Sequence, residues 1–326
     1  MPDLFPYPRR PGQADLVRLV RETVENGRQA VIESGTGTGK TVVSLAGALE
    51  GAAGRRIIYL TRTKSQQRQV AVEARAIGAR TPLLFVAVQG RGPTTCPLMA
   101  EDPSLADGTA EELSKLCTEL KKGSGPAGSC PYFEALGSTQ VEEATAFLRE
   151  THPEPEQFFT YCKERGFCPY EAVKRIMPAA DVVAATYAFF FQAGVRRRFF
   201  EWLNVQPRDA VVIVDEAHNL PGYLREVNTC CCTARALDLA DAEAGRCGNP
   251  EVCQGLTVTD MTQAVRDIIA AAQADYLRGD DGFLPPDFLN EELMERLGLS
   301  TAGIAAAVKG LAECGESVAA DAKAKR

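Results

Sequence analysis

A glycine-rich segment near the start of the chain carries the residue types that bind nucleotide phosphates. Residues 33–41 read Glu-Ser-Gly-Thr-Gly-Thr-Gly-Lys-Thr. Small residues let backbone N–H groups turn towards phosphate oxygens, and the helix expected to follow adds the positive end of its dipole. Lys40 can then reach the β- and γ-phosphates of ATP, and the Thr41 hydroxyl can bind Mg²⁺. The predicted nucleotide contacts are Gly35, Thr36, Gly37, Thr38, Gly39, Lys40 and Thr41.

This segment departs from the strict phosphate-loop pattern at one position. Ser34 stands where the first glycine of the pattern is expected. The alternative interpretation is a glycine-rich structural turn that binds no nucleotide. An expected strand before the segment and a helix after it favour the phosphate loop.

A second segment places carboxylates at the end of an apolar run. Val-Val-Ile-Val at 211–214 is followed by Asp215, Glu216, Ala217 and His218. A buried strand that ends here projects these side chains from its carboxyl end, where ligands bind in parallel sheets. We predict that Asp215 holds Mg²⁺ and that Glu216 orients or deprotonates the attacking water, with Lys40 and His218 in the same catalytic group. The alternative is a structural helix cap.

Five cysteines lie between these two segments, and four converging thiolates can bind an iron–sulfur cluster or zinc. The candidates are Cys96, Cys117, Cys130, Cys162 and Cys168. The absence of a Cys-x-x-Cys pair argues against a ribbon-type zinc site. Unrelated buried cysteines are the alternative.

The elements around these segments predict an α/β fold with a mainly parallel sheet. Apolar runs predict strands at 30–32, 57–60, 181–185 and 211–214, and helices are expected at 14–26 and 41–50. The α/β pattern stops after Gly90 and returns near Asp181, so an insert sits within one domain. From about residue 228 the chain looks helical and acidic, with Asp260 and Gln263 as an expected cap pair.

The composition limits the classes to which the protein can belong. The chain has 326 residues, 45% of them hydrophobic, and a net charge of −7, which argues against a wholly basic nucleic-acid binder. Neither a signal peptide nor a membrane-length apolar run is evident, so we expect no membrane partner and a cytoplasmic location. Thiols are kept reduced there, which favours metal ligands or buried side chains over disulfides for the eleven cysteines.

The Gly-Lys-Thr and Asp-Glu-Ala-His segments together resemble superfamily 2 helicases. Residues 59–63, Tyr-Leu-Thr-Arg-Thr, resemble the nucleic-acid-contacting motif Ia of those enzymes, and residues 8–13 resemble their Q motif. The cysteine contexts at 90–96, 130–134 and 167–170, and the segment 179–187, are similar to the XPD/DinG family of iron–sulfur helicases.

The resemblance implies a domain plan and a set of ligands. A RecA-like lobe would occupy 1–90 and 177–227, an iron–sulfur insert 91–176, and part of a helical Arch domain 228–326. The implied [4Fe–4S] ligands are Cys96, Cys117, Cys130 and Cys168, with Cys162 able to replace Cys117. Gln13 would lie near the adenine. The implied DNA contacts are Thr61, Arg62 and Tyr187, although core packing is the alternative for the aromatic run around Tyr187.

The resemblance also implies an activity. Family members couple ATP hydrolysis to 5′→3′ movement on single-stranded DNA, with repair or transcription proteins as expected partners. No second ATPase lobe is recognisable before Arg326, so we expect these residues alone to bind nucleotide weakly and to hydrolyse it poorly. Two alternatives remain open at this point. One is a non-catalytic fragment that binds DNA or a partner, and the other is a phosphate-loop ATPase with a zinc-stapled insert.

Overall fold

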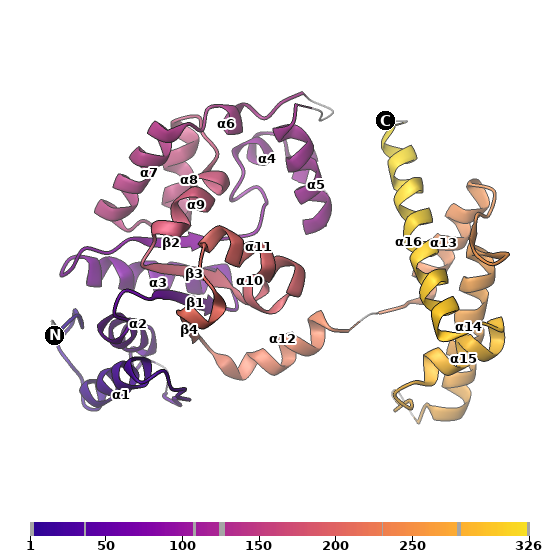
Figure 1. The fold of residues 1–326 in the computed structure, drawn as a ribbon, viewed down its shortest axis with the longest axis horizontal. Helices are drawn as coiled ribbons and strands as arrows, with labels where there is room; N and C mark the ends of the chain where they lie inside the picture. Colours follow the sequence, from indigo (N-terminus) through magenta and orange to yellow (C-terminus); the bar gives the residue numbers. More distant parts are fainter. Residues whose placement is uncertain are drawn as a thin grey trace. The chain divides into compact units, whose positions relative to one another are not determined.

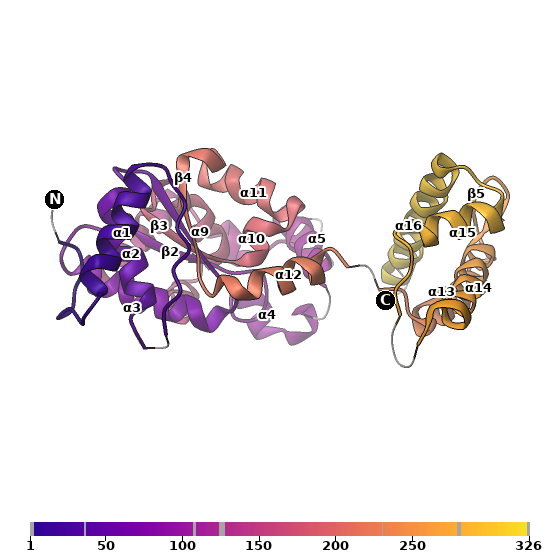
Figure 2. The same cartoon turned by 90° about the horizontal axis from the view of Figure 1, so that it is seen from below.

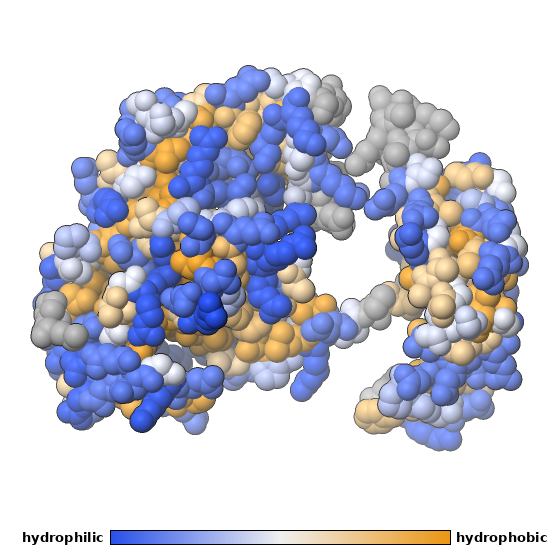
Figure 3. Space-filling model, in the orientation of Figure 1, coloured by the Kyte–Doolittle hydropathy of each residue, from blue (hydrophilic) through white to orange (hydrophobic). Residues whose placement is uncertain are grey.

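The computed structural model describes residues 3–35, 37–106, 109–123, 128–229, 231–278 and 282–324. The chain forms two compact units, Met1–Asn228 and Thr229–Arg326, and each is described by itself (Figures 1 and 2). Polar and charged residues cover much of the surface shown in Figure 3, interrupted by apolar areas. Within the described ranges, no helix has both the length and the apolar character needed to cross a membrane.

A four-stranded parallel sheet forms the centre of the first unit. Its strands are β1 (Arg56–Thr61), β2 (Phe85–Val88), β3 (Val182–Thr186) and β4 (Ala210–Val214). They lie in the order β2-β3-β1-β4, and all neighbours run parallel. The predicted α/β class is confirmed, as are the strands expected at 57–60, 181–185 and 211–214.

Two sequence predictions about strands need correction. The apolar run 30–32 forms no strand, because no described strand pairs with it and the Val31 side chain is fully exposed. Three apolar residues are too few to distinguish a strand from a loop. Conversely, β2 was not predicted, although its residues are almost entirely buried between two helical layers.

Three helices cover one face of the sheet. They are α1 (Gln13–Glu25), α2 (Lys40–Gly51) and α3 (Lys64–Gly78). Alternate residues of β1, Ile57 and Tyr59, share their hydrophobic cluster. The helices α1 and α2 pack closely at Gly47, where an added Cβ would lie 2.7 Å from the Val17 carbonyl oxygen. The predicted helices at 14–26 and 41–50 are thereby confirmed to within about one residue.

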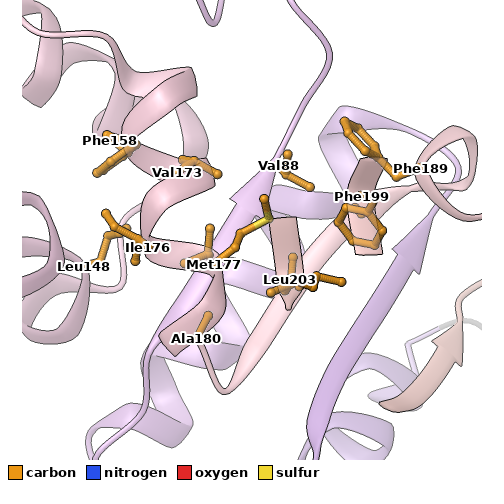
Figure 4. Close-up of a cluster of buried hydrophobic side chains, with 14 of the residues drawn as sticks. Val88, Leu148, Phe158, Val173, Ile176, Met177, Ala180, Phe189, Phe199 and Leu203 are labelled. Carbon is orange, nitrogen blue, oxygen red and sulfur yellow. The ribbon is translucent and has the colours of Figure 1, made fainter. Parts of the chain in front are cut away.

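The insert after β2 is largely helical. Its elements are α4 (Pro97–Glu101), η1 (Pro103–Ala106), α5 (Ala110–Lys121), α6 (Pro131–Glu134), α7 (Ser138–Thr151), α8 (Pro155–Glu164), α9 (Pro169–Ile176) and η2 (Met177–Ala179). Leu148, Phe158 and Val173 from these helices join the cluster on the opposite face of the sheet, where Phe199 and Leu203 also pack (Figure 4). The insert therefore shares its core with the sheet.

The rest of the first unit connects β3 to β4 and leads out of the sheet. It consists of α10 (Tyr187–Phe191), α11 (Ala193–Leu203), η3 (Pro207–Asp209), η4 (Ala217–Asn219) and α12 (Leu220–Val227). The helix α10 begins directly at the carboxyl end of β3, and two residues, Asp215 and Glu216, separate η4 from the end of β4. Both therefore start at the sheet edge where the acidic segment lies.

The second unit is mainly helical and has its own core. It contains α13 (Ala234–Arg246), a short antiparallel pair of β5 (Glu251–Cys253) and β6 (Leu256–Thr257), α14 (Val258–Tyr276), α15 (Phe288–Leu297) and α16 (Thr301–Ala324). The predicted cap pair is wrong. The N-cap of α14 is Thr257, and Asp260 is its capping-box partner, so Gln263 lies outside the cap.

Candidate functional site

The glycine-rich segment forms a closed loop at the start of α2. Gly37 and Gly39 adopt left-handed backbone conformations with φ of 74° and 80°, which glycine tolerates without a steric penalty. The Thr38 hydroxyl donates to the Gly35 carbonyl at 2.9 Å. Lys40 is the first residue of the twelve-residue helix α2, so the positive helix end faces the loop. Thr36, predicted to contact nucleotide, lies outside the described residues.

The acidic segment meets this loop. Pairing of β4 with β1 continues past the strand, because the Asp215 amide donates to the Leu60 carbonyl at 2.9 Å. Glu216 follows in a left-handed conformation with φ of 49°, and its Oε1 lies 3.0 Å from Nζ of Lys40. Two motifs far apart in the chain are thereby joined by an ion pair.

Asp215 lies in an environment that opposes its charge. Burial raises the pKa of its carboxyl, and the neighbouring Glu216 carboxylate raises it further, against a smaller opposing effect of Lys40. Within the described ranges, no three Cys, His, Asp or Glu side chains are grouped so that they could hold a metal ion. A Mg²⁺ ion in a nucleotide site usually takes only one or two protein ligands together with phosphate oxygens and water. Asp215 and Thr41 supply oxygen atoms of the kind that Mg²⁺ takes from proteins.

Two buried tyrosines support the acidic segment and the phosphate loop. The Tyr59 side chain is 1% exposed, and its hydroxyl bonds the Ser44 hydroxyl at 3.4 Å and the side chain of Thr41. The Tyr187 hydroxyl donates to the carbonyls of Asp215 and Glu216. Sequence reasoning missed Tyr59, because a tyrosine within an apolar run reads as a core residue.

The predicted role of Tyr187 needs correction. Its side chain is 1% exposed and its hydroxyl is used within the protein, so the ring is not available for stacking on a base. Thr61, also predicted to contact DNA, is fully buried, and its hydroxyl donates to the Thr63 carbonyl at 3.1 Å. Arg62 differs from both, since its side chain is exposed at the end of β1 and donates to Asn219 Oδ1 at 2.8 Å. Of the three predicted DNA contacts, only Arg62 is accessible.

Gln13 lies against the phosphate loop. Its Nε2 donates to the Thr38 carbonyl at 2.8 Å, and its Oε1 accepts from the Arg10 amide at the same distance. The Arg10 guanidinium in turn donates to the Gly37 carbonyl at 2.7 Å. The segment before α1 is thus bonded directly to the loop.

Three of the candidate thiols share an unusual local setting. Cys96, Cys130 and Cys168 are each the N-cap of a helix whose next residue is proline. Backbone amides of the first turn lie near each sulfur and act to lower its pKa. Burial raises the pKa of all three thiols, that of Cys168 to about 12, and the amide donors oppose the shift.

Cys117 and Cys162 differ in their surroundings. Cys117, on α5, interacts electrostatically with Cys96, Cys130 and Cys168, and Arg91 hydrogen-bonds to its sulfur. Cys162 is fully buried in the hydrophobic cluster of the insert, and burial raises the pKa of its thiol strongly. We call Cys96, Cys117, Cys130 and Cys168 the thiol group. Cys162 also interacts electrostatically with Cys168, and no three of the described thiols are grouped so that they could hold a metal ion.

Comparison with known proteins identifies related chains. The family DEAD_2 matches residues 59–237. The chain is 26% identical over 258 residues to the Saccharomyces cerevisiae general transcription and DNA repair factor IIH helicase subunit XPD/RAD3, covering 73% of this chain and 32% of that protein. It is also 26% identical over 215 residues to the ATP-dependent DNA helicase XPD of Sulfolobus acidocaldarius, covering 65% and 33%.

The fold has a counterpart among solved structures. An XPD helicase structure matches with a TM-score of 0.54 at 18% identity, covering 89% of this chain and 48% of that one. The chain spans about a third of the length of the two curated relatives.

The raised pKa of Asp215 predicts how stability depends on pH. Because this carboxyl has a raised pKa in the folded protein, the native state holds its proton to higher pH than the unfolded state does. The carboxylate therefore lowers the free energy of unfolding, and this loss grows as pH rises above the ordinary aspartate pKa of about 4. In Mg²⁺-free buffer near neutral pH, Asp215→Asn should raise the free energy of unfolding, by less than about 1 kcal/mol because the carboxyl is partly solvated.

Thermal or urea unfolding followed by circular dichroism measures this difference. The gain should shrink as the pH falls towards about 4. Asp209→Asn, at an exposed position before β4, is the matched control and should change little. If Asp215→Asn lowered the stability at neutral pH, the Asp215 carboxylate would be stabilising in the folded protein, and the raised pKa would be wrong.

Proposed function

The chain belongs to the DEAD_2 family, the XPD/DinG-like helicases of superfamily 2, and from this premise we propose that residues 1–228 form the first motor lobe of an ATP-dependent DNA helicase. The observation that carries the proposal is the 3.0 Å contact between Lys40 of the phosphate loop and Glu216 of the acidic segment. It brings a phosphate-binding cation and a candidate general base to one place.

The geometry supports ATP hydrolysis with defined roles. Lys40 leaves Glu216 for the β- and γ-phosphates, while Thr41 and Asp215 are the protein groups that would hold Mg²⁺. When bound, Mg²⁺ neutralises developing charge on the phosphates. Glu216 accepts a proton from the water whose oxygen attacks the γ-phosphorus. The bond from that phosphorus to the bridging oxygen breaks, which leaves ADP and inorganic phosphate.

Movement on DNA requires more than this lobe. Stepping depends on two lobes that close on ATP and reopen after hydrolysis, and a missing arginine finger lowers the rate by about 10³–10⁵-fold. We therefore expect residues 1–326 alone to bind nucleotide and hydrolyse it slowly, and not to unwind a duplex. Within a complete motor we propose 5′→3′ translocation on single-stranded DNA, with Thr229–Arg326 as part of an Arch domain.

We propose that the thiol group holds a [4Fe–4S] cluster. The donor types fit, because the four sulfurs influence one another electrostatically and nearby backbone amides lower the pKa of three of them, which favours the thiolate form. No three of them are grouped to hold a metal ion in the described structure, so a cluster would require the cysteine-bearing segments to come closer together. The Arg91 guanidinium beside Cys117 adds a positive charge to the site. Cys162 is better explained as a core residue. A cluster there would tie together α4, α5, α6 and α9 at their cysteine-bearing positions.

The free thiols also bear on the compartment in which the protein works. Ten cysteines are free among the described residues, so a reducing compartment such as the cytoplasm suits the chain. DNA repair or transcription proteins are the partners that we propose. This is because the yeast relative is named as a subunit of a transcription and DNA repair factor.

The nucleotide proposal predicts the effect of removing Lys40. Lys40→Ala should weaken Mg-ATP binding by about 10- to 100-fold, because hydrogen bonds to charged groups contribute roughly 1.5–3 kcal/mol. Titration calorimetry measures the affinity. Lys64→Ala is the control, since Lys64 is exposed at the start of α3 and bonds Thr94 instead. If Lys40→Ala and the unmodified chain bound Mg-ATP with equal affinity, the loop would be a structural turn that binds no nucleotide.

The cluster proposal predicts iron content. Anaerobically purified chain should contain about four irons and absorb broadly in the visible range. Cys130→Ser and Cys168→Ser should lose the iron, whereas Cys162→Ala should retain it. If Cys162→Ala lost the iron and Cys117→Ser kept it, Cys162 would be the fourth ligand instead of Cys117. Stoichiometric zinc without iron would support a zinc-stapled insert.

The DNA proposal predicts a salt-dependent contact at Arg62. Binding of oligo-dT should weaken as salt rises, and Arg62→Ala should reduce the slope of log affinity against log salt by about one phosphate contact. Fluorescence anisotropy provides the measurement. Arg18→Ala, on α1 and paired with Asp15, should leave the slope unchanged. Binding that ignores salt would favour a protein-interaction role.

A further inference from the structure

The turn between α7 and α8, residues 151–157, is bonded to the lobe by polar contacts, and we call it the corner. The Arg75 guanidinium of α3 donates to the carbonyls of Thr151 and His152 at 3.1 and 3.2 Å. It also donates to Gln157 Oε1 at 3.1 Å. The corner is therefore the part of the insert that is docked on the end of α3.

The His152 side chain enters the lobe from this corner. It is 5% exposed, and its Nε2 lies 2.8 Å from the Leu83 carbonyl oxygen, just before β2. Gly78 at the end of α3 leaves the space that the imidazole occupies, because an added Cβ would lie 2.4–3.0 Å from three ring atoms. The His152 backbone is left-handed, with φ of 42°, which is unfavourable for a residue with a side chain. The contacts of the ring therefore hold the corner in a strained shape.

The Leu83 carbonyl fixes the tautomer of the imidazole. A carbonyl oxygen only accepts, so Nε2 of His152 carries a proton and donates it. Nδ1 is then without a proton in the neutral ring, and a second proton would have to be added there. Burial lowers the pKa of His152, the bond to Leu83 opposes this shift, and the Arg75 guanidinium lowers the pKa further. The ring is therefore neutral at pH 7.

Within the described part of the chain, no carboxylate acts on this ring to stabilise a positive charge. The charged side chains on the elements around it are Arg75, Arg80, Arg149, Glu150, Glu154 and Glu156. Of these, Arg75 has an electrostatic effect on the imidazole, and it repels a positive charge. Glu156 pairs with Arg68 of α3 at 2.8 Å, and Asp181 accepts from a backbone amide before β2 at 2.7 Å. A protonated His152 would thus be a buried cation without a counter-charge.

We propose that His152 is an acid-sensitive latch, which holds the corner on α3 while the imidazole is neutral and releases it when the imidazole is protonated. Release takes the ring from the space beside Gly78 into water, where the ordinary histidine pKa of about 6.5 applies. The Arg68–Glu156 ion pair joins the same corner to α3, so release also leaves Arg68 without its partner. The latch involves none of the residues assigned to nucleotide, DNA or metal.

Proton binding sets the pH dependence of the release. The closed corner keeps His152 neutral to lower pH than the open corner does, so the open corner binds one more proton in that range. The closed state has its full advantage above a pH of about 6.5 and loses it progressively below that value. The equilibrium constant for opening should therefore rise about tenfold for each pH unit below about 6.5, until the closed state is protonated as well.

Imidazole ¹⁵N NMR tests the protonation state directly. The chain has two histidines, and the other, His218, has an exposed side chain whose Nδ1 lies 3.3 Å from Glu216 Oε2. Loss of one signal in His218→Gln assigns the remaining signal to His152. His152 should show the neutral Nε2–H form at pH 7 and titrate with a pKa below about 6.5. An Nδ1–H form, or a pKa at or above that value, overturns the latch.

Hydrogen exchange followed by mass spectrometry measures the release in the full chain. Peptides that cover the corner and the end of α3 report the opening constant, after correction for the pH dependence of the intrinsic exchange rate. Between about pH 7.5 and pH 5 this constant should rise about 10- to 30-fold. Peptides from α1 should show no such rise. An opening constant of the corner that does not change with pH overturns the proposal.

Two variants separate the latch from general effects of acid. His152→Gln keeps an N–H donor for the Leu83 carbonyl but cannot gain a proton, so its corner should open to the same extent at both ends of this pH range. Equal pH dependence in His152→Gln and the unmodified chain would assign the release to other groups and overturn the latch.

Gly78→Ala should open the corner already at neutral pH, because its Cβ would lie 2.4 Å from the imidazole. Gly194→Ala is the matched control, since an added Cβ there meets no atom within 4 Å. This comparison decides the question even if His152→Gln does not fold. If the corner of Gly78→Ala opened no more than that of Gly194→Ala, the imidazole would not be what holds the corner in place.

Discussion

Parallel, in-register pairing of β1 with its two neighbours is the constraint on which the site depends. Thr61 pairs with Thr186 of β3, and Leu60 pairs with Val214 of β4, so the three strands end at nearly the same level. The residues that follow them, Arg62, Tyr187 and Asp215, therefore emerge at one edge of the sheet. Parallel sheets place ligand sites at this edge because side chains of consecutive loops converge there. The phosphate loop needs only to reach the same edge for the site to be complete.

The site stores unfavourable free energy that the surrounding structure offsets. Glu216 has a positive φ, which costs a residue with a side chain about 1–2 kcal/mol, and Asp215 beside it is partly buried next to a like charge. Tyr187 holds the turn through two carbonyls, while Lys40 supplies the nearest positive charge. Binding of a cation at Asp215 would remove the repulsion. The unliganded arrangement is thus less stable than the fold could be, as expected where function sets the local geometry.

Sequence patterns predicted those parts of the structure that a few consecutive residues specify. The glycine-rich loop, the acidic segment and three of the four strands of the parallel sheet were found because each is a short run with its own signature. β2 was missed because Phe85–Val88 carries no motif, and the strand at 30–32 was wrong because strand formation requires a partner that no local pattern shows. The same limit applies to side chains. Whether Thr61 faces solvent, or whether Asn219 meets Arg62, depends on pairing between distant segments.

The insert is mechanically part of the lobe, because α9 links the thiol group to the far end of the sheet. Cys168 caps the start of α9, and the carbonyls of η2, which follows its other end, accept from Arg56 at the first residue of β1. On the other side, Arg68 of α3 pairs with Glu156 of α8 at 2.8 Å, five residues after the α3 N-cap at Thr63. The helix that begins beside Arg62 thus also holds the insert. A change at the thiols would therefore reach the carboxyl end of β1, where Arg62 lies, through packed elements rather than through a flexible linker.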